Sequence, residues 1–283
     1  MEESSILKRK PIIVTLTSIP PRYENLPRRF AALERQTVAP DLVELYLPKS
    51  YRRFPGPRPA LPPLPDWVKV IDVEEDLGPA TKILPATSKW YSHDVDLLLC
   101  DDDRLQDRQW ISRLARTRLE RPRDIICERA WNIDERFGIA RKELHHPRAR
   151  LAKDGGRSFW YRLVKRLTLK KLYHQVPRRI YDCPGYADVF EGFLGVLVPP
   201  QAFHGDVWNI PDIVWTVDDV WLSGMALVNG YRVWANGIPR PVYHDGVCDK
   251  IAALRDFSVS GVGRGDADRL AVDFLREKYG IWQ

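Results

Sequence analysis

The sequence predicts an α/β protein with a mainly parallel central sheet, and three observations support this. Apolar, β-branched runs alternate with amphipathic segments over residues 1–129, which is the pattern of βαβ units. The run at residues 97–100 has the length of a strand buried on both faces. This run then stops at three carboxylates, Asp101, Asp102 and Asp103, and ligands of α/β sheets bind at the carboxyl ends of strands.

The first half of the chain alternates expected strands with expected helices. Strands are expected at 12–17, 42–47, 67–73, 97–100 and 124–127, and helices at about 24–36, 80–91 and 107–120. The segment 48–66 contains seven prolines in 19 residues, which removes hydrogen-bond donors from any sheet ladder. We therefore expect a surface loop there rather than a domain boundary.

The second half is less regular. The apolar run 189–198 predicts a central strand, in which two glycines indicate close backbone approach. A helix is expected within 211–229, with Thr216 as its N-cap and two acids in its first turn. A last strand at 231–235 and a helix at about 266–279 complete the chain.

Composition and charge limit the class of protein. The 283 residues are 44% hydrophobic and 29% charged, a globular composition, and no repeat at a fixed period is present. The net charge of +6 predicts a surface that attracts anions. Four separated cysteines without a C-x-x-C pair argue against a zinc site or a disulfide framework and favour a reducing setting. The apolar run at 12–14 is too short for a signal peptide or a membrane span.

The segment 130–184 breaks the alternation. Its part from Arg157 to Arg179 holds eight Lys or Arg residues, no acid, and interleaved aromatic and aliphatic residues. A basic amphipathic helix of this kind is typical of a surface that lies in a lipid headgroup region. A helix packed on the core with a solvated basic face is the alternative. No recognition motif accompanies the patch, so nucleic acid is not expected as a partner.

Four motifs together resemble the GT-A fold glycosyltransferases, which move a sugar from a nucleotide diphosphate donor to an acceptor. They are T-S-I-P-P-R after the first strand, G-P-A-T-K at 78–82, D-D-D at 101–103, and E-G-F-L-G followed by V-D-D-V-W-L-S-G. The resemblance implies a single GT-A domain over 1–283. Its parts would be a nucleotide-sugar-binding half (1–129), a basic insert (130–184), and an acceptor half with a C-terminal tail (185–283).

The resemblance also implies a donor site with a metal ion. Asp101 and Asp103 point to the same side of an extended chain and suit a hard cation such as Mn²⁺ or Mg²⁺, with His244 as a further ligand. The residues expected to bind the donor are Thr15, Thr17, Arg22, Lys82, Asp101 and Asp102. The alternative for the three acids is a solvated acidic turn. The alternatives for His244 and Lys82 are a loop histidine and a surface lysine without a ligand.

The acidic pair Asp218 and Asp219 resembles the pair that begins the acceptor-side helix of this fold. An inverting transferase needs a carboxylate to take the proton of the acceptor hydroxyl. Asp219 is the expected base, with Asp218 orienting it or binding acceptor hydroxyls. Acids in a first helical turn also stabilise the helix dipole, so capping explains one of them. A retaining mechanism stays open, with Glu191 as an acceptor contact.

We expect a cytoplasmic protein that uses a glycan or lipid-linked glycan acceptor, and a peripheral position on the cytoplasmic face of a membrane stays open. Two other classes stay open. A strand closed by D-x-D also occurs in haloacid dehalogenase-like phosphatases, although Arg104 and Leu105 depart from that pattern. A basic lipid-binding or nucleic-acid-binding module would explain the segment from Arg157 to Arg179, but leaves both acidic clusters unexplained.

Overall fold

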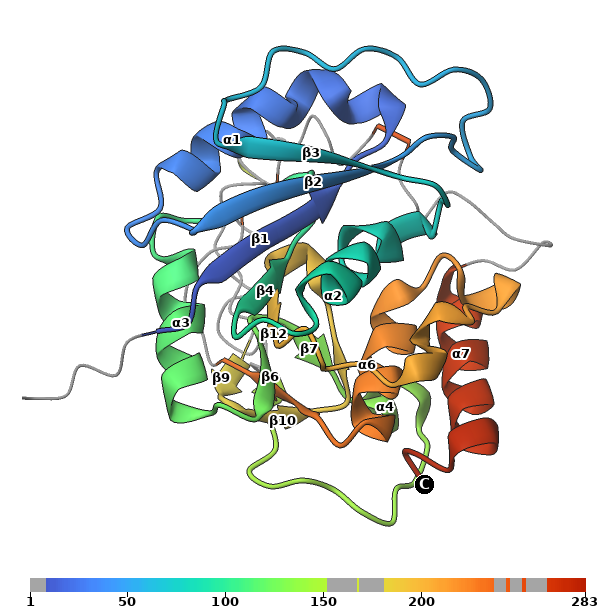
Figure 1. Ribbon diagram of the computed structural model, residues 1–283. Coiled ribbons are helices and arrows are strands. Elements are labelled where there is room, and N and C mark those ends of the chain that lie inside the picture. Colours follow the sequence, from blue (N-terminus) through green and yellow to red (C-terminus); the bar gives the residue numbers. More distant parts are fainter. Residues whose placement is uncertain (1–8, 152–166, 168–180, 237–242, 245–250, 253–263) are drawn as a thin grey trace, which may run out of the picture.

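The computed structural model describes residues 9–151, 167, 181–236, 243–244, 251–252 and 264–283. Its centre is a mixed sheet of eight strands with helices on both faces (Figure 1). The strands, in their order across the sheet, are β10 (Gly185–Ala187), β13 (Arg232–Ala235), β6 (Asp124–Cys127), β12 (Val196–Val198), β4 (Asp96–Leu99), β1 (Ile12–Thr17), β2 (Leu42–Pro48) and β3 (Val68–Val73). The predicted α/β class is confirmed.

Parallel pairing dominates the half of the sheet built from the first hundred residues. The pairs β3–β2, β2–β1 and β1–β4 are all parallel, with Ile13 opposite both Leu42 and Leu97. β12 runs antiparallel to β4 and β6, and β13 is parallel to β6. The carboxyl ends of β1, β2 and β4 therefore meet at one edge, which is where ligands of such sheets bind.

Two hydrophobic cores lie on opposite faces of this sheet. Along β4, Leu98 belongs to one core, while Leu97 and Leu99 belong to the other, because successive side chains of a strand alternate. The core of Leu98 is covered by α1 (Leu26–Glu34) and α3 (Trp110–Glu120). The other core is covered by α2 (Leu84–Trp90), α6 (Asp218–Val228) and α7 (Arg264–Tyr279). Each fully buried leucine contributes about 1.5–3 kcal/mol.

Helices α6 and α7 pack closely together. A Cβ on Gly224 of α6 would lie 2.5 Å from Leu275 Cδ1 of α7, so a larger residue would have to displace the Leu275 side chain. α6 is buried over most of its length, including Trp221 and Met225. The first two residues of α6, Asp218 and Asp219, lie near residues at the carboxyl ends of β1 and β4.

Short elements complete the structure. Three pairs of strands lie outside the main sheet: β5 (Arg104–Leu105) with β14 (Tyr243–His244), β7 (Ala130–Trp131) with β11 (Val189–Phe190), and β8 (Arg150–Leu151) with β9 (Tyr181–Cys183). The short helices are η1 (Pro20–Asn25), η2 (Gly78–Lys82), α4 (Ile133–Phe137), η4 (Gly192–Leu194), η5 (Gly205–Trp208) and η6 (Asp212–Val214).

Two local predictions were wrong. The segment 189–198 is not one strand, because the 3-10 turn η4 separates β11 from β12, and Gly195 takes a φ of 94° that side chains rarely adopt. Thr216 does not cap α6: the N-cap is Val217, without a side-chain hydrogen bond. The helix predicted at about 24–36 is present as α1 (Leu26–Glu34), and the first two residues of the predicted range belong to η1.

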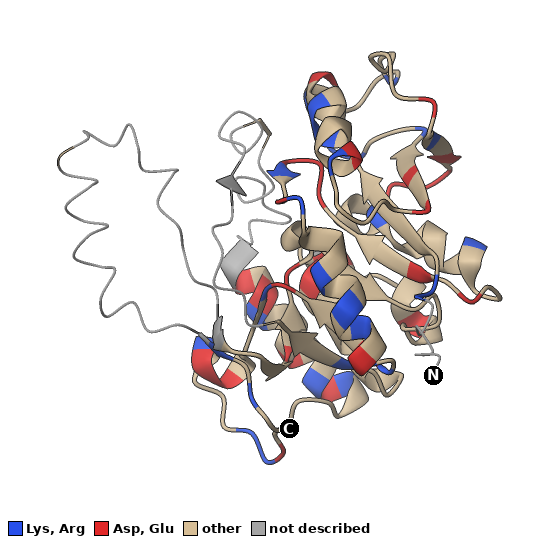
Figure 2. Ribbon diagram, turned by 90° about the vertical axis from the view of Figure 1, so that its left-hand side faces the viewer, with Lys and Arg blue, Asp and Glu red and all other residues tan. Residues whose placement is uncertain are grey.

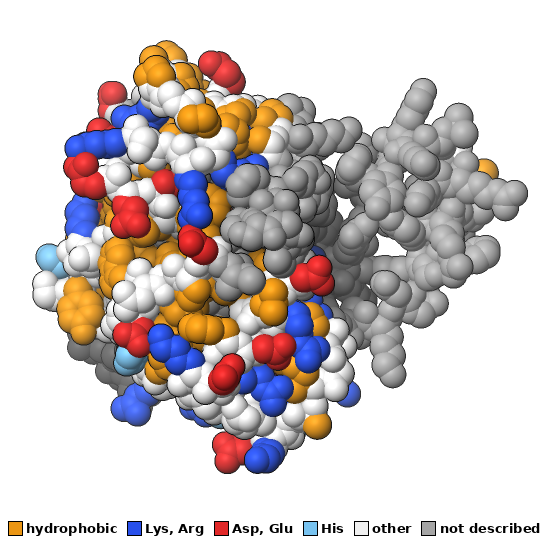
Figure 3. Space-filling model, turned by 90° about the vertical axis from the view of Figure 1, so that its right-hand side faces the viewer, with side chains coloured by type: hydrophobic (Ala, Val, Ile, Leu, Met, Phe, Trp, Pro, Cys, Tyr) orange, Lys and Arg blue, Asp and Glu red, His pale blue; other side chains and the backbone are white. Residues whose placement is uncertain are grey.

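The segment from Arg157 to Arg179 lies outside the described residues except for Leu167, so its predicted role stays a prediction. No described helix combines the length and hydropathy needed to cross a bilayer. Elsewhere, acidic and basic residues are interspersed on the surface helices (Figure 2). The face seen in Figure 3 mixes hydrophobic side chains with charges of both signs.

Candidate functional site

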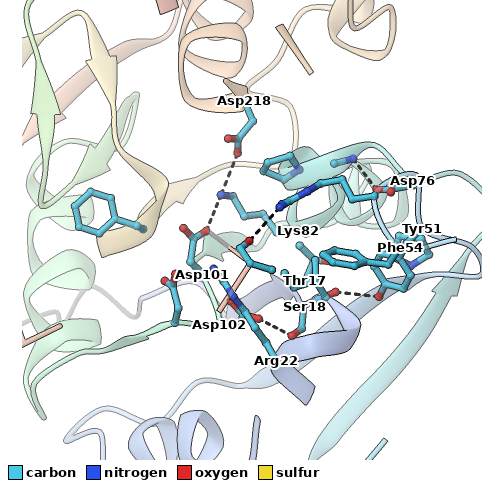
Figure 4. Close-up of a pocket in the computed structure, with 18 of the residues that line it drawn as sticks. Thr17, Ser18, Arg22, Tyr51, Phe54, Asp76, Lys82, Asp101, Asp102 and Asp218 are labelled. Atoms are coloured by element: carbon cyan, nitrogen blue, oxygen red, sulfur yellow. Dashed lines mark hydrogen bonds and ion pairs between the residues drawn. The ribbon is translucent and has the colours of Figure 1, made fainter. Parts of the chain in front are cut away.

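A cavity opens at the carboxyl edge of the sheet, between the ends of β1, β2 and β4 and the N-terminus of α6 (Figure 4). Its volume is about 1120 Å³, part of which is open solvent. The residues that line it are Thr17, Ser18, Ile19, Arg22, Pro48, Tyr51, Arg53, Phe54, Asp76, Gly78, Pro79, Lys82, Asp101, Asp102, Asp103, Arg104, Phe193, Trp215, Asp218, Asp219 and Ala252. Both acidic clusters found in the sequence therefore face one hollow.

The three acids after β4 have different partners. β4 ends at Leu99 and the chain turns at Asp102 and Asp103, so the alternation expected of an extended chain does not apply. Asp101 Oδ1 lies 2.7 Å from Lys82 Nζ. Asp102 accepts hydrogen bonds from Ser18 Oγ at 2.5 Å and Arg22 Nη1 at 2.9 Å, which tie this turn to the loop after β1.

Asp103 is the least compensated of the three. Its Oδ2 lies 3.2 Å from Arg22 Nη1, while its buried Oδ1 has no hydrogen-bond partner among the described residues and lies 3.7 Å from Arg104 Nε. Burial and the charges of Asp101 and Asp102 raise the pKa of Asp103 to about 6. Burial also raises the pKa of Asp102, even against the charge of Arg22.

Lys82 lies at the centre of the site, almost fully buried. Its Nζ is 2.7 Å from Asp101 Oδ1 and 3.0 Å from Asp218 Oδ2, and the side chain is 3% exposed. Burial alone would lower the pKa of Lys82, but the charges of Asp101, Asp218 and Asp219 outweigh it and hold that pKa well above its usual range. Burial raises the pKa of Asp101, and the adjacent ammonium more than reverses this, so the net shift is downward.

Asp218 and Asp219 are the first two residues of α6 and differ in exposure. Asp218 is 5% exposed and directed at Lys82, whereas Asp219 is more exposed and accepts a hydrogen bond from the Gly192 N–H at 2.9 Å. A Cβ on Gly192 would lie 3.0 Å from both Asp219 Oδ1 and Lys82 Nζ. The glycine of E-G-F-L-G thus allows the backbone to approach both side chains.

The cavity brings most of the predicted donor residues together, but not all. Thr17, Arg22, Lys82 and the three acids after β4 line it. Thr15 is fully buried within β1 and is not a lining residue, because the cavity begins at the strand's end. The backbone of His244 pairs with Arg104, directly after the acids, while its side chain lies outside the description. Glu191 does not line the cavity and forms an ion pair with Arg129.

Aromatic lining residues were not predicted from the sequence. Tyr51 and Phe54 come from the start of the proline-rich segment, and Tyr51 donates a hydrogen bond to the Ser18 carbonyl at 2.9 Å. Phe193, which lies within η4, and Trp215, which lies shortly before α6, also line the cavity. The aromatic residues among the prolines could have indicated that this segment contacts the cavity, since a purely solvated loop gains nothing from aromatic side chains.

The charge of the cavity favours an added cation. Its described lining residues include four cationic side chains and six carboxylates, a formal charge of −2 when all are ionised. Nevertheless, the described residues contain no group of three or more His, Cys, Asp or Glu side chains positioned to hold a metal ion. The buried Oδ1 of Asp103, which accepts no hydrogen bond from a described residue, is a candidate ligand for a Mg²⁺ or Mn²⁺ ion whose other ligands would include water and substrate phosphates.

Comparison with known proteins gives a limited result. No protein-family model and no curated protein matches the chain. Among solved structures, it is similar to the mannosyltransferase PcManGT from Pyrobaculum calidifontis in complex with GDP-Man and Mn²⁺ (TM-score 0.44, 12% identity, 82% of this chain and 58% of that one). It is also similar to 4-diphosphocytidyl-2C-methyl-D-erythritol synthase (TM-score 0.41, 13% identity, 86% of this chain and 95% of that one). A third similar structure is that of S. aureus TarS 1–349 (TM-score 0.41, 12% identity, 95% of this chain and 72% of that one).

The chain thus spans less than two thirds of the mannosyltransferase chain. At these identities and scores, the likenesses do not assign an activity to this protein. The function has to be argued from its own cavity.

Proposed function

We propose that this protein is a metal-dependent GT-A glycosyltransferase that moves a sugar from a nucleotide diphosphate donor to a glycan or lipid-linked glycan acceptor. The observation that carries the proposal is the meeting of two acidic clusters across one cavity. One cluster, Asp101 to Asp103, lies at the edge of the sheet where nucleotides bind, and the other, Asp218 and Asp219, begins a helix on the opposite side.

The donor half of the cavity combines aromatic surface with positive charge. Tyr51 and Phe54 offer ring surface for a nucleobase, and Arg22 and Arg53 carry guanidinium groups that suit phosphate oxygens. A divalent cation bound through Asp101 and Asp103, with His244 as a further proposed ligand, would stabilise the charge of the leaving diphosphate as a Lewis acid. Asp102 holds Arg22 and the loop after β1 in place.

Asp219 is the proposed base of an inverting reaction. As the acceptor oxygen forms its bond to the anomeric carbon, the bond from that carbon to the diphosphate oxygen breaks, and the hydroxyl proton passes to Asp219. The Gly192 N–H fixes one oxygen of this carboxylate, and Asp218 beside it is held by Lys82. Asp219 is also the more exposed member of the pair, which suits contact with an acceptor.

Association with a membrane remains a separate part of the proposal. It depends on the eight basic residues between Arg157 and Arg179, which account for more than the whole net charge of +6. Binding to vesicles that contain anionic lipid, and loss of binding after these residues are neutralised, would test it. The proposed cytoplasmic location depends instead on the four separated cysteines, which favour a reducing setting.

The test of function is transfer from a panel of nucleotide sugars in the presence of Mn²⁺, with GDP-mannose included because PcManGT binds it. Asp219→Asn should reduce kcat by about a thousandfold or more, in the upper range for loss of a general base, while donor binding is retained. Asp273→Asn, an exposed change on α7, is the matched control and should leave transfer unchanged. Formation of a covalent aspartyl phosphate at Asp101 would instead favour the phosphatase hypothesis.

A further inference from the structure

We propose that Lys82 is a positioning residue, the internal counter-ion of the cavity, which holds Asp101 and Asp218 together and limits how tightly Asp101 binds a divalent cation. This inference rests on the proposed function, because it concerns the same cavity. It differs from the expectation that Lys82 binds a donor phosphate directly.

The contacts of Lys82 link elements that are far apart in the sequence. Lys82 ends η2, Asp101 follows β4, and Asp218 begins α6. In Figure 4 the ammonium lies between the two carboxylates, with Nζ–Oδ distances of 2.7 Å and 3.0 Å. The ammonium thus ties the donor side of the cavity to the acceptor side.

The burial of this group argues against a primary role in phosphate binding. The side chains of Lys82 and Asp218 are 3% and 4% exposed, so the ammonium is turned toward protein carboxylates rather than toward solvent. Breaking such a buried pair is costly, because the remaining charge has no compensation. A phosphate could reach Lys82 only in competition with carboxylates that already contact it.

Gly192 makes room for this arrangement. Its absent side chain would lie 3.0 Å from Lys82 Nζ and 3.0 Å from Asp219 Oδ1. The ammonium therefore sits among three carboxylates, those of Asp101, Asp218 and Asp219, and all three hold it in the charged form. A single positive charge among three negative ones cannot neutralise them, but it weakens their attraction for a second cation.

The consequence for metal binding is specific. Asp101 Oδ1, an oxygen that could ligate a metal, is engaged by the ammonium, and two cations a few ångströms apart repel each other. Removing the ammonium should therefore tighten divalent-cation binding. A direct phosphate ligand predicts the opposite pattern, in which loss of Lys82 weakens nucleotide binding and leaves the affinity for metal alone unchanged.

The first experiment measures Mn²⁺ binding to the full chain without donor, by electron paramagnetic resonance of free Mn²⁺. Lys82→Met should bind Mn²⁺ about tenfold or more tightly than the wild type, and lower kcat far more than it changes the donor KM. Lys69→Met, an exposed change on β3, is the control and should leave both quantities unchanged. Unchanged or weaker Mn²⁺ binding by Lys82→Met would overturn the inference.

A second experiment needs neither metal nor activity, because it compares the thermal unfolding of the two single variants with that of the double variant. Asp218→Asn alone should lower Tm, whereas in the Lys82→Met background it should raise Tm, because it removes a carboxylate that has lost its counter-ion. Additive effects of the two changes would overturn the inference. If the effects of the two changes on Tm are not additive but transfer is undiminished in EDTA, the metal dependence of the proposed function fails. The positioning role of Lys82 then still stands.

Discussion

Two buried charge clusters of this protein differ in how well their carboxylates are compensated. In the first, Asp188 is 6% exposed and both its oxygens are bound, by Arg148 at 2.9 Å and 2.7 Å, by Arg141 at 2.6 Å and by the Ile133 N–H at 3.0 Å. In the second, Asp103 is similarly buried, yet its Oδ1 accepts no hydrogen bond from a described residue.

The pKa values show the same contrast. Burial raises the pKa of Asp188, but its arginine partners more than reverse this, so the pKa lies below the usual range. Burial and neighbouring acids raise the pKa of Asp103 to about 6. Structural ion pairs contribute to stability, whereas a buried surplus of negative charge indicates a site prepared for a cation. The predictions below test this distinction.

The largest expected effect is on activity and comes from Asp103→Asn. If Asp103 helps hold the cation, this variant should lose about 4 kcal/mol of transition-state stabilisation, which is about a thousandfold in kcat/KM. Its free energy of unfolding without metal should not fall, because the substitution removes a poorly compensated buried charge. Transfer kinetics and urea denaturation measure the two quantities. Normal transfer by this variant would show that Asp103 is not needed to bind the cation.

Asp188→Asn should behave in the opposite way. It leaves Arg141 and Arg148 without their shared carboxylate, and we expect a loss of about 3–5 kcal/mol in the free energy of unfolding. Tm should fall by roughly 10 °C in a calorimetric scan. Transfer per folded molecule should be retained, since Asp188 does not line the cavity. A stable but inactive variant would contradict the structural role assigned to this cluster.

A smaller effect is expected on the pH dependence of stability. Because the pKa of Asp188 is depressed in the folded state, its contribution is fully present above its unfolded pKa of about 3.9, and is lost as the pH falls through its folded pKa. The stability difference between the wild type and Asp188→Asn should therefore shrink below about pH 4. Urea unfolding between pH 3 and pH 7 measures it; a constant difference across this range would contradict the assignment.

The regular elements were predictable because each depends on local residue pattern. The strands β1, β4 and β6 lie at or within one residue of the expected ranges, since an apolar run of that length is stable mainly as a buried strand. The break between β11 and β12 was not predictable in the same way. An apolar run with two glycines does not reveal that one of them takes a positive φ.

The site was predictable as a set of residues but not as a set of contacts. The acids after β4 and at the start of α6 were recognised because carboxylates are unusual beside buried runs. Their pairing with Lys82 depends on how η2, β4 and α6 pack, which no local pattern records. The role of Tyr51 was missed because the prolines around it indicated only an extended loop.

The most direct test of the central claim is a thermal-shift measurement on the full chain with a nucleoside diphosphate, with Mn²⁺ or with EDTA. If the acidic cavity needs a cation to accept a diphosphate, the nucleotide should raise Tm only in Mn²⁺, by several degrees at about 100 times its Kd, where binding adds about 2.7 kcal/mol. An equal shift in EDTA, or no shift with any nucleoside diphosphate in Mn²⁺, would contradict the claim.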